Sequence, residues 1–301
     1  MTVVGRPLVE CVPNVSEGRR LEVIEELAEA VRSTPHVRLL DYSWDGAHHR
    51  SVFTFVGPPQ PVLDAALALA AVAVRRIDLR SHQGLHPRIG AVDVVPFVPL
   101  RGVTLEDCVE LSRAFARALW ERHRVPVYFY AHSAVRPERR WLPNIRRGGF
   151  EGLQSTITEP DRHPDVGEPA LHPTAGATAT GARGLLIAWN FTLATEDVQV
   201  ARTVARRVRQ SSGGLPGIQA AGWALPQGGV QVSVNVLDYR TTPLHVLYEA
   251  VCREAARLGV EVASTEFVGL VPAEALAQVA AWALRSANLD VLRVLEARLV
   301  E

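Results

Sequence analysis

Residues 195–239, TEDVQVARTVARRVRQSSGGLPGIQAAGWALPQGGVQVSVNVLDY, change their hydrophobic period part-way along. Apolar residues at helical spacing predict a helix over 195–210, with Thr195 as its N-cap. The rest predicts two strands, 217–225 and 229–239, joined around the turn PQGG. A helix followed by two paired strands is the middle of a βαββαβ unit, so the neighbouring residues decide whether the unit is complete.

The residues on both sides complete that unit. GLLIAWNFTL (184–193) predicts a strand before the helix. PLHVLYEAVCREAARLG (243–259) predicts a second helix, and VEVASTEFVG (260–269) predicts a closing strand. This order of elements is typical of a ferredoxin-like fold.

The first half of the chain predicts the same order of elements. They are a strand at 7–13, a helix within 16–35 that Ser16 caps, strands at 36–43 and 50–57, a helix at 60–79, a strand at 91–100, and then one more helix and strand at 105–123 and 125–130. The prolines of AVDVVPFVPL (91–100) predict that this strand lies at an edge of the sheet or at its end. We therefore predict an α/β (α+β) fold of two ferredoxin-like βαββαβ subdomains, residues 1–180 and 181–301.

The segment between these halves, residues 131–183, has little periodicity and is rich in Arg, Pro, Gly and His. A loop of this length is usually functional or disordered. Its last part, GEPALHPTAGATATGARG (167–184), allows two interpretations. It is either a flexible linker or a segment whose backbone amides line a ligand, because small side chains permit close approach.

Composition excludes several classes of protein. The formal net charge of the 301 residues is zero, which does not favour nucleic acid or an anionic membrane as a partner. No apolar stretch is long enough to cross a bilayer, and the N-terminus does not read as a signal peptide. Cys11, Cys108 and Cys252 are far apart and odd in number, which predicts a reducing, cytoplasmic location without disulfides or a zinc cluster.

All 32 basic residues are arginine. The absence of lysine excludes Schiff-base chemistry of the pyridoxal-phosphate type, and it excludes a P-loop. Codon bias in a GC-rich genome explains the composition without a function, and the two exclusions hold in either case.

The stretch HQGLHPR (82–88) contains two histidines at a spacing of four. Gly84 and Pro87 interrupt any helix there, so the spacing is not that of a helical metal pair. His82 and His86 are then surface histidines, metal ligands without an evident third partner, or a general acid/base, since histidine titrates nearest neutral pH. Arg88 could hold a carboxylate in bidentate fashion.

A second polar loop, DYSWDGAHHR (41–50), joins two predicted strands. It is either a solvated hairpin loop or a second wall of the same site, because neighbouring strands would carry it near His86. Asp45 and Arg50 are its candidate binding residues, together with Asn14 on the first strand-to-helix turn.

Four separated motifs carry a resemblance to a known family. ECVPNVSEGR, RSVFTFVG, HQGLHPRIGAVDVVPFVPL and GATATGARGLLIAWN occur in that order, and the match runs over approximately residues 7 to 280. Together they resemble the formiminotransferase family, the glutamate formimidoyltransferases. Some members continue into a cyclodeaminase domain. This chain ends at residue 301 and resembles the transferase module alone.

The resemblance implies a fold, an activity and partners. It implies two ferredoxin-like subdomains with a folate groove between them, in a homodimer. It implies transfer of the formimino group of N-formimino-L-glutamate to N5 of tetrahydrofolate, within histidine degradation. Tetrahydrofolate is then a co-substrate, and the chemistry needs no metal.

The resemblance also implies roles for particular residues. His86 of the HPR motif is the implied catalytic histidine. The chemistry of the transfer adds that His82 orients it or binds substrate, and that Arg50, Arg88 and Arg183 are the candidate clamps for the two donor carboxylates. The implied folate contacts are Gly167, Glu168, Pro169, Ala170, Leu171, His172, Pro173, Thr174, Ala175 and Gly176, with Gly213 and Gly214.

Two positions depart from the pattern of the family. Ser43 stands where members carry an acidic residue, and His49 stands where they carry asparagine, so Asp45 becomes the alternative source of a carboxylate. Residues 216–218, basic in some members, are Pro-Gly-Ile here, which leaves polyglutamate preference open. The departures keep two alternatives open: a folate-dependent enzyme with a formyl or other formimino donor, and a folate-binding protein without catalysis.

Overall fold

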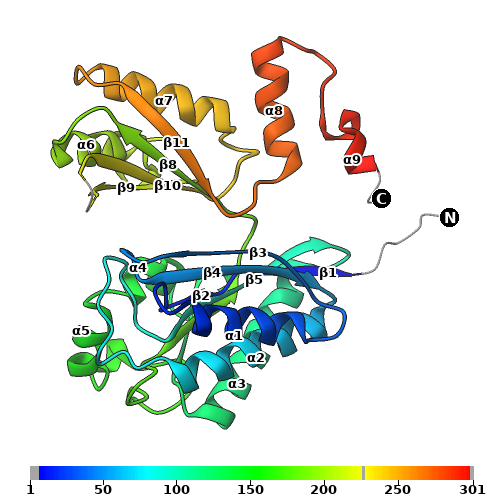
Figure 1. Cartoon of the computed structure of the whole chain (residues 1–301), viewed down its shortest axis with the longest axis vertical. Helices are drawn as coiled ribbons and strands as arrows, with labels where there is room; N and C mark the ends of the chain where they lie inside the picture. Colours follow the sequence, from blue (N-terminus) through cyan, green and yellow to red (C-terminus); the bar gives the residue numbers. More distant parts are fainter. Residues whose placement is uncertain (1–6, 226–227, 299–301) are drawn as a thin grey trace. The chain divides into compact units, whose positions relative to one another are not determined.

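Two separate sheets form in this chain, and the boundary between the two units falls after Arg183 (Figure 1). The computed structural model describes residues 7–225 and 228–298. Part of the predicted PQGG turn, Pro226 and Gln227, therefore lies outside the described residues. Each unit is described by itself below.

The first unit contains the predicted βαββαβ order. Its elements are β1 (Leu8–Cys11), β2 (Asn14–Val15), α1 (Leu21–Arg32), β3 (Arg38–Asp45), β4 (Arg50–Gly57), α2 (Pro59–Arg76), β5 (Val92–Arg101), α3 (Leu105–His123), β6 (Val127–Phe129) and β7 (Thr178–Ala182). Antiparallel pairs place β4 between β3 and β1–β2, and place β5 on the other side of β1–β2. This is the strand order of a ferredoxin-like sheet, and β7 and β6 extend it in parallel beyond β5.

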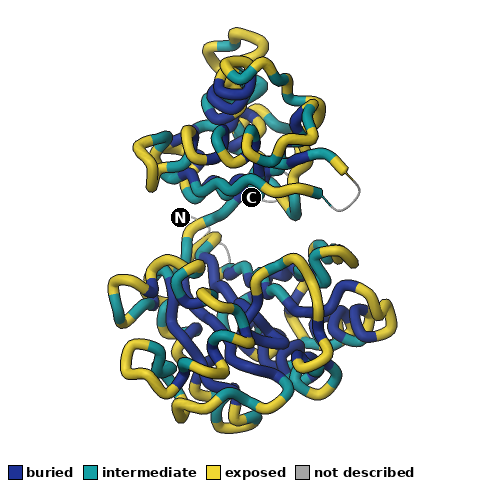
Figure 2. Tube along the Cα trace, turned by 90° about the vertical axis from the view of Figure 1, so that its left-hand side faces the viewer, coloured by how far each residue is buried: buried dark blue, intermediate teal, exposed yellow. Residues whose placement is uncertain are grey.

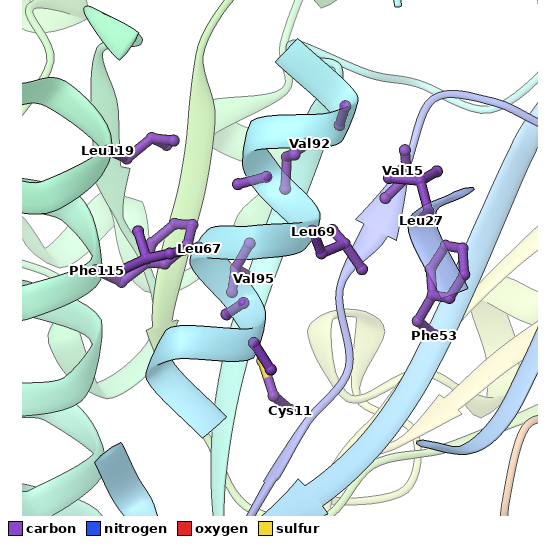
Figure 3. Packing of buried hydrophobic residues seen from close by; sticks show 14 of the residues in the cluster. Cys11, Val15, Leu27, Phe53, Leu67, Leu69, Val92, Val95, Phe115 and Leu119 are labelled. Carbon is purple, nitrogen blue, oxygen red and sulfur yellow. The ribbon is translucent and has the colours of Figure 1, made fainter. Parts of the chain in front are cut away.

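Helices α1, α2 and α3 cover one face of this sheet (Figure 1). Phe53 and Phe55 alternate along β4 toward those helices and are fully buried, together with Leu69 and Phe115. Figure 3 shows how side chains of this cluster interdigitate between helices and strands. Burying each such side chain stabilises the fold by roughly 1.5–3 kcal/mol, which anchors the strands that carry the polar loops.

The predicted caps of two helices are wrong. Helix α1 begins at Leu21, and the Ser16 hydroxyl donates instead to the Gly90 carbonyl at 2.7 Å. The Glu17 carboxylate accepts hydrogen bonds from the backbone N–H groups just ahead of the helix. In the second unit, Asp197 rather than Thr195 caps α6 (Val198–Val208). In both cases the sequence offers several capping side chains, and tertiary contacts decide which one is used.

The predicted edge position of the proline-containing strand is also wrong. Strand β5 lies inside the sheet, between β1–β2 and β7. Cys11 pairs with Phe97 and Asn14 pairs with Val94, so Pro96 lies opposite the interruption between β1 and β2. The missing N–H of proline therefore costs the ladder little at this position.

The segment of low periodicity before β7 is folded, and the part for which a flexible linker was one of two interpretations, residues 167–184, includes the buried strand β7. It contains η1 (Ala131–Ser133), η2 (Pro137–Arg140), α4 (Leu142–Ile145), α5 (Gly149–Thr156) and η3 (Pro160–Arg162). Arg139 forms a buried ion pair with Asp165 at 2.5 Å, and Arg162 donates to the backbone carbonyls of Asn144 and Ile145. All five residues of β7 are buried.

The second unit repeats the same strand order. Its elements are β8 (Ile187–Leu193), α6, η4 (Gln210–Ser212), β9 (Ile218–Ala224), β10 (Val230–Val236), α7 (Leu244–Ala256) and β11 (Val262–Val268). The antiparallel order β11-β8-β10-β9 is ferredoxin-like. Helix α8 (Ala273–Leu284), η5 (Val291–Arg293) and α9 (Leu295–Arg298) follow. Figure 2 shows buried residues concentrated inside each unit, and each unit has its own hydrophobic cluster.

Candidate active site

Two loops of the first unit are joined along their backbones. Leu85 N–H donates to the Ala47 carbonyl at 3.2 Å, and His86 N–H donates to the His48 carbonyl at 3.4 Å. Gly84 is required by this contact, since a Cβ atom there would lie 2.4 Å from the His48 oxygen. The HPR loop and the loop between β3 and β4 thus form one wall, of residues 46–49 and 82–88. That this wall lines a substrate site stays a prediction.

This wall brings His86 to Arg50 and Asn14. Nε2 of His86 lies 2.9 Å from Nη1 of Arg50, which also donates to Oδ1 of Asn14 at 3.1 Å. Arg50 begins β4 and Asn14 lies on the neighbouring β2. A guanidinium can only donate, so Nε2 of His86 accepts and its ring proton is on Nδ1.

The surroundings of His86 disfavour its charged form. Burial and the adjacent Arg50 guanidinium hold the pKa of His86 well below its usual range, and the charge of Arg146 adds to this. Burial, together with Arg146, also lowers the pKa of Arg50 to about 10. Asp93 pairs with Arg146 and partly offsets its charge. His86 is therefore a neutral imidazole at neutral pH.

His82 supports the wall. Its Nε2 donates to the His49 carbonyl at 2.9 Å, and its Nδ1 accepts from Nε of Arg88 at 2.8 Å. Burial lowers the pKa of His82 to about 4. Arg88 contacts both carboxylate oxygens of Glu151 on α5, at 2.8 and 3.0 Å. The bidentate carboxylate partner of Arg88 in this structure is thus a side chain of the protein.

The departure at His49 has a structural consequence. His49 has a left-handed backbone, with φ of 51°, a conformation that asparagine adopts more readily than histidine. Its ring stacks on His82 with centroids 4.0 Å apart. Its Nε2 lies 3.2 Å from Oε1 of Glu17, and its Nδ1 lies 3.0 Å from the Gln83 carbonyl. His49 therefore links the start of α1 to the HPR loop.

Asp45 stabilises the turn between β3 and β4. Its Oδ1 accepts from the backbone N–H groups of Ala47 and His48, both at 2.7 Å, and its Oδ2 lies 3.1 Å from Nδ1 of His48. Burial raises the pKa of Asp45, but these contacts outweigh burial and keep that pKa below its ordinary value. The imidazole that Asp45 contacts is that of His48, not that of His86. Ser43 lies on β3, opposite Val52.

The remaining predicted binding residues of the first unit lie just before β7, at 167–176, and just after it, at Arg183. Gly176 pairs with Gly90 in an isolated bridge, and Thr174 accepts from Leu79 N–H at 2.8 Å, which places this end of the 167–176 segment against the chain that enters β5. Glu168, Pro169 and Ala170 are exposed. Arg183 follows β7 and opposes the pKa increase that burial causes at Glu10.

Gly213 and Gly214 belong to the second unit. Gly213 has a left-handed backbone with φ of 83°, and Gly214 N–H donates to the Arg209 carbonyl. Their contact with folate stays a prediction, as do the folate contacts of residues 167–176.

Sequence reasoning missed four residues that shape this site: Glu17, Asp93, Arg146 and Glu151. Asp93 is an acidic residue within the apolar stretch AVDVV, a signal that could have identified it as a partnered group. Glu17 stands among Ser, Gly and Arg and carried no such signal. Arg146 and Glu151 come from the segment of low periodicity and carried no comparable signal. Across residues 7–225 and 228–298, no three His, Cys, Asp or Glu side chains are grouped so that they could hold a metal ion.

Comparison with known proteins assigns the family. The model of the N-terminal subdomain of the formiminotransferase domain matches residues 8–183, and the model of the formiminotransferase domain matches residues 188–300. The chain belongs to the formiminotransferase family. The family resemblance predicted from the four motifs is thereby confirmed.

Several formiminotransferases cover nearly the whole chain. The chain is 42% identical to glutamate formimidoyltransferase of Streptococcus pyogenes serotype M1 over 284 residues, which covers 94% of this chain and 95% of that protein. It is 41% identical to glutamate formimidoyltransferase of Thermoplasma acidophilum, with 97% of each chain covered. Formimidoyltransferase-cyclodeaminase of Gallus gallus is 42% identical, and the match covers 54% of that longer protein. Among the described residues, none of the helices has the length and apolar character to cross a membrane.

Proposed function

We propose that this formiminotransferase moves the formimino group of N-formimino-L-glutamate to N5 of tetrahydrofolate. The observation that carries the proposal is the match along nearly the full length of both chains to proteins named glutamate formimidoyltransferase, with identities of 41–42%. The cluster of Asn14, Arg50 and His86 supports it, because a neutral imidazole beside a cation suits a donor that bears carboxylates.

The reaction exchanges one carbon–nitrogen bond for another. N5 of tetrahydrofolate attacks the formimino carbon and gives a tetrahedral intermediate. The bond from that carbon to the glutamate nitrogen then breaks. N5 loses one proton and the departing nitrogen gains one, so a single proton shuttle balances the reaction.

His86 is the proposed shuttle. It is neutral at neutral pH because of burial and Arg50, so it starts in the form that can accept a proton. The resulting imidazolium can then donate to the departing nitrogen. Holding both substrates against one wall would contribute much of the rate by proximity.

The test is a transfer assay with the purified full chain, tetrahydrofolate and a panel of donors. We expect N-formimino-L-glutamate to be the best donor. A higher kcat/KM with N-formyl-L-glutamate, or with formimino derivatives of other amino acids, would overturn the donor assignment in favour of the alternative enzyme. Tight binding of tetrahydrofolate without transfer from any donor would favour the non-catalytic alternative.

A further inference from the structure

The hydrogen bond between Arg50 and His86 occupies the atom that the shuttle needs. A neutral imidazole has one lone pair in the ring plane that can accept a proton. In this structure that lone pair is on Nε2, and it accepts from Nη1 of Arg50 at 2.9 Å. His86 therefore presents only an N–H group, at Nδ1, and cannot remove a proton from N5 until Arg50 releases it.

Arg50 retains capacity for another acceptor. Nη1 donates to Asn14 and His86. Within the described part of the chain, its Nε and Nη2 atoms have no hydrogen-bond partner, and neither is among the buried polar atoms that lack one. An Arg fork with free N–H groups matches a carboxylate in bidentate geometry. A carboxylate bound end-on, through Nη1 and Nη2, would compete with Nε2 of His86 for Nη1, whereas one bound side-on, through Nε and Nη2, would leave that contact in place.

We infer that end-on capture of a donor carboxylate by Nη1 and Nη2 of Arg50 is what releases Nε2 of His86 for proton transfer. Arg50 is then a positioning residue that determines specificity, because a donor without a carboxylate leaves Nε2 of His86 hydrogen-bonded to Arg50. This inference rests on the proposed function, since it assumes that His86 is the shuttle. It assigns Arg50 rather than Arg88 to the donor, because Arg88 already holds Glu151.

The charges around His86 also make carboxylate binding favour proton acceptance by its imidazole. The groups that face His86 are Arg50 on β4, Arg146 after α4, and His48 and His82 on the two loops. Arg50 in turn faces Arg146, Asp93 and Asp45. A bound carboxylate adds a negative charge beside these cations, which favours protonation of the imidazole.

The direct test follows the His86 ring without turnover. The full chain, labelled with ¹⁵N-histidine, is titrated with pH by long-range ¹H–¹⁵N NMR, with and without glutarate, a dicarboxylate that carries no group to transfer. Without glutarate, we expect a neutral ring protonated at Nδ1. With glutarate, the His86 pKa should rise by about one unit or more, and the Nε2 resonance should move. A ring that titrates identically up to the highest soluble glutarate concentration would overturn the inference.

Variants separate Arg50 from general effects on the fold. In Arg50→Gln, the His86 pKa should be raised without glutarate and should not respond to it. Arg38→Gln is the matched control, because Arg38 is an exposed arginine on the same sheet, and it should titrate as wild type. Arg50→Lys keeps the charge, so its circular dichroism spectrum and His86 titration report on the site if Arg50→Gln does not fold.

Kinetics give a second readout. Formamidine carries a formimino group but no carboxylate, so wild type should prefer N-formimino-L-glutamate strongly over it. Arg50→Gln should reduce that ratio of kcat/KM values by about tenfold or more. In this variant, Nε2 of His86 is free of the Arg50 hydrogen bond with either donor. An unchanged ratio would contradict the role of Arg50. Loss of transfer from every donor in wild type would overturn the proposed function instead, while the glutarate titration would still test the contact.

Discussion

At the scale of single residues, His86 is the side chain on which the proposed chemistry depends. His86→Ala should reduce kcat by about 100-fold or more, the usual effect of losing a general acid/base, while tetrahydrofolate binding changes little. Steady-state kinetics and a folate titration measure both quantities. His132→Ala is a suitable control because His132 is an exposed histidine of the same unit. A kcat within a few-fold of wild type would exclude His86 as the shuttle.

Glu17 makes the stability of the site wall depend on pH. Burial raises the pKa of Glu17, but hydrogen bonds from the N–H groups of Arg20 and Arg19, with the Arg20 guanidinium, outweigh burial and lower the pKa below 4.5. A carboxyl with a depressed folded pKa contributes stability that is fully present above its unfolded pKa. That contribution is lost as the pH falls through the folded pKa.

Glu17→Gln should therefore lower the melting temperature at pH 7. The destabilisation should be roughly 1–3 kcal/mol, the usual cost of removing a charged hydrogen-bond acceptor. The gap from wild type should narrow as the pH falls below about 4.5. Calorimetry from pH 7 to acid measures this gap, with Glu22→Gln as the exposed control on α1. A gap that stays constant across the range would show that the Glu17 charge is unimportant.

The sequence could predict the site residues that lie next to predicted strands, but not the contact that depends on how two loops pack. His86, Arg50 and Asn14 lie next to predicted strands, so their proximity followed from the expected sheet. The contact between Nη1 and Nε2 could not be predicted, because it depends on how two loops join through Gly84.

At the scale of elements, the sequence could predict those helices and strands whose buried residues recur at a regular spacing. Both βαββαβ orders came from alternating and helical apolar patterns, and the strand order in each sheet agrees with them. The segment before β7 shows such a pattern only around α5, where Phe150, Leu153 and Ile157 are buried. Elsewhere, hydrogen bonds from arginines to carbonyls hold it. Strand β7 is buried throughout and consists of small residues, so it shows no alternation.

The buried ion pair of Arg139 and Asp165 should be required for the stability of the segment before β7. Their side chains are each only 5% exposed, and the two also bind the backbone of His163 and Phe129. Arg139→Met leaves a buried carboxylate without its partner, so we expect destabilisation of about 3–5 kcal/mol. Urea unfolding followed by tryptophan fluorescence measures it.

Arg136→Met is the matched control, since Arg136 is 3.8 Å from the fully exposed Asp161. It should change stability by less than about 1 kcal/mol. Equal effects of the two variants would contradict the conclusion that the pair of Arg139 and Asp165 holds the segment before β7 in place.

At the scale of the whole molecule, the proposed catalytic cluster belongs entirely to the first unit. Asn14, Arg50 and His86, with the groups that tune them, all precede Arg183. That unit also has its own hydrophobic core, built from Phe53 and many other fully buried side chains. A unit of this size with its own core is large enough to fold independently.

We therefore expect residues 1–183 to fold as an isolated fragment. The fragment should unfold in one cooperative transition, and its His86 ring should be protonated at Nδ1, as in the full chain. Calorimetry and imidazole NMR measure these properties. A cooperative fragment with an altered His86 tautomer would show that the second unit is needed to form the contact between Arg50 and His86. A fragment without a cooperative transition would show that the core of the first unit is insufficient by itself. If both properties are retained, the glutarate titration can be repeated on the fragment, where a response of His86 can come only from residues of the first unit.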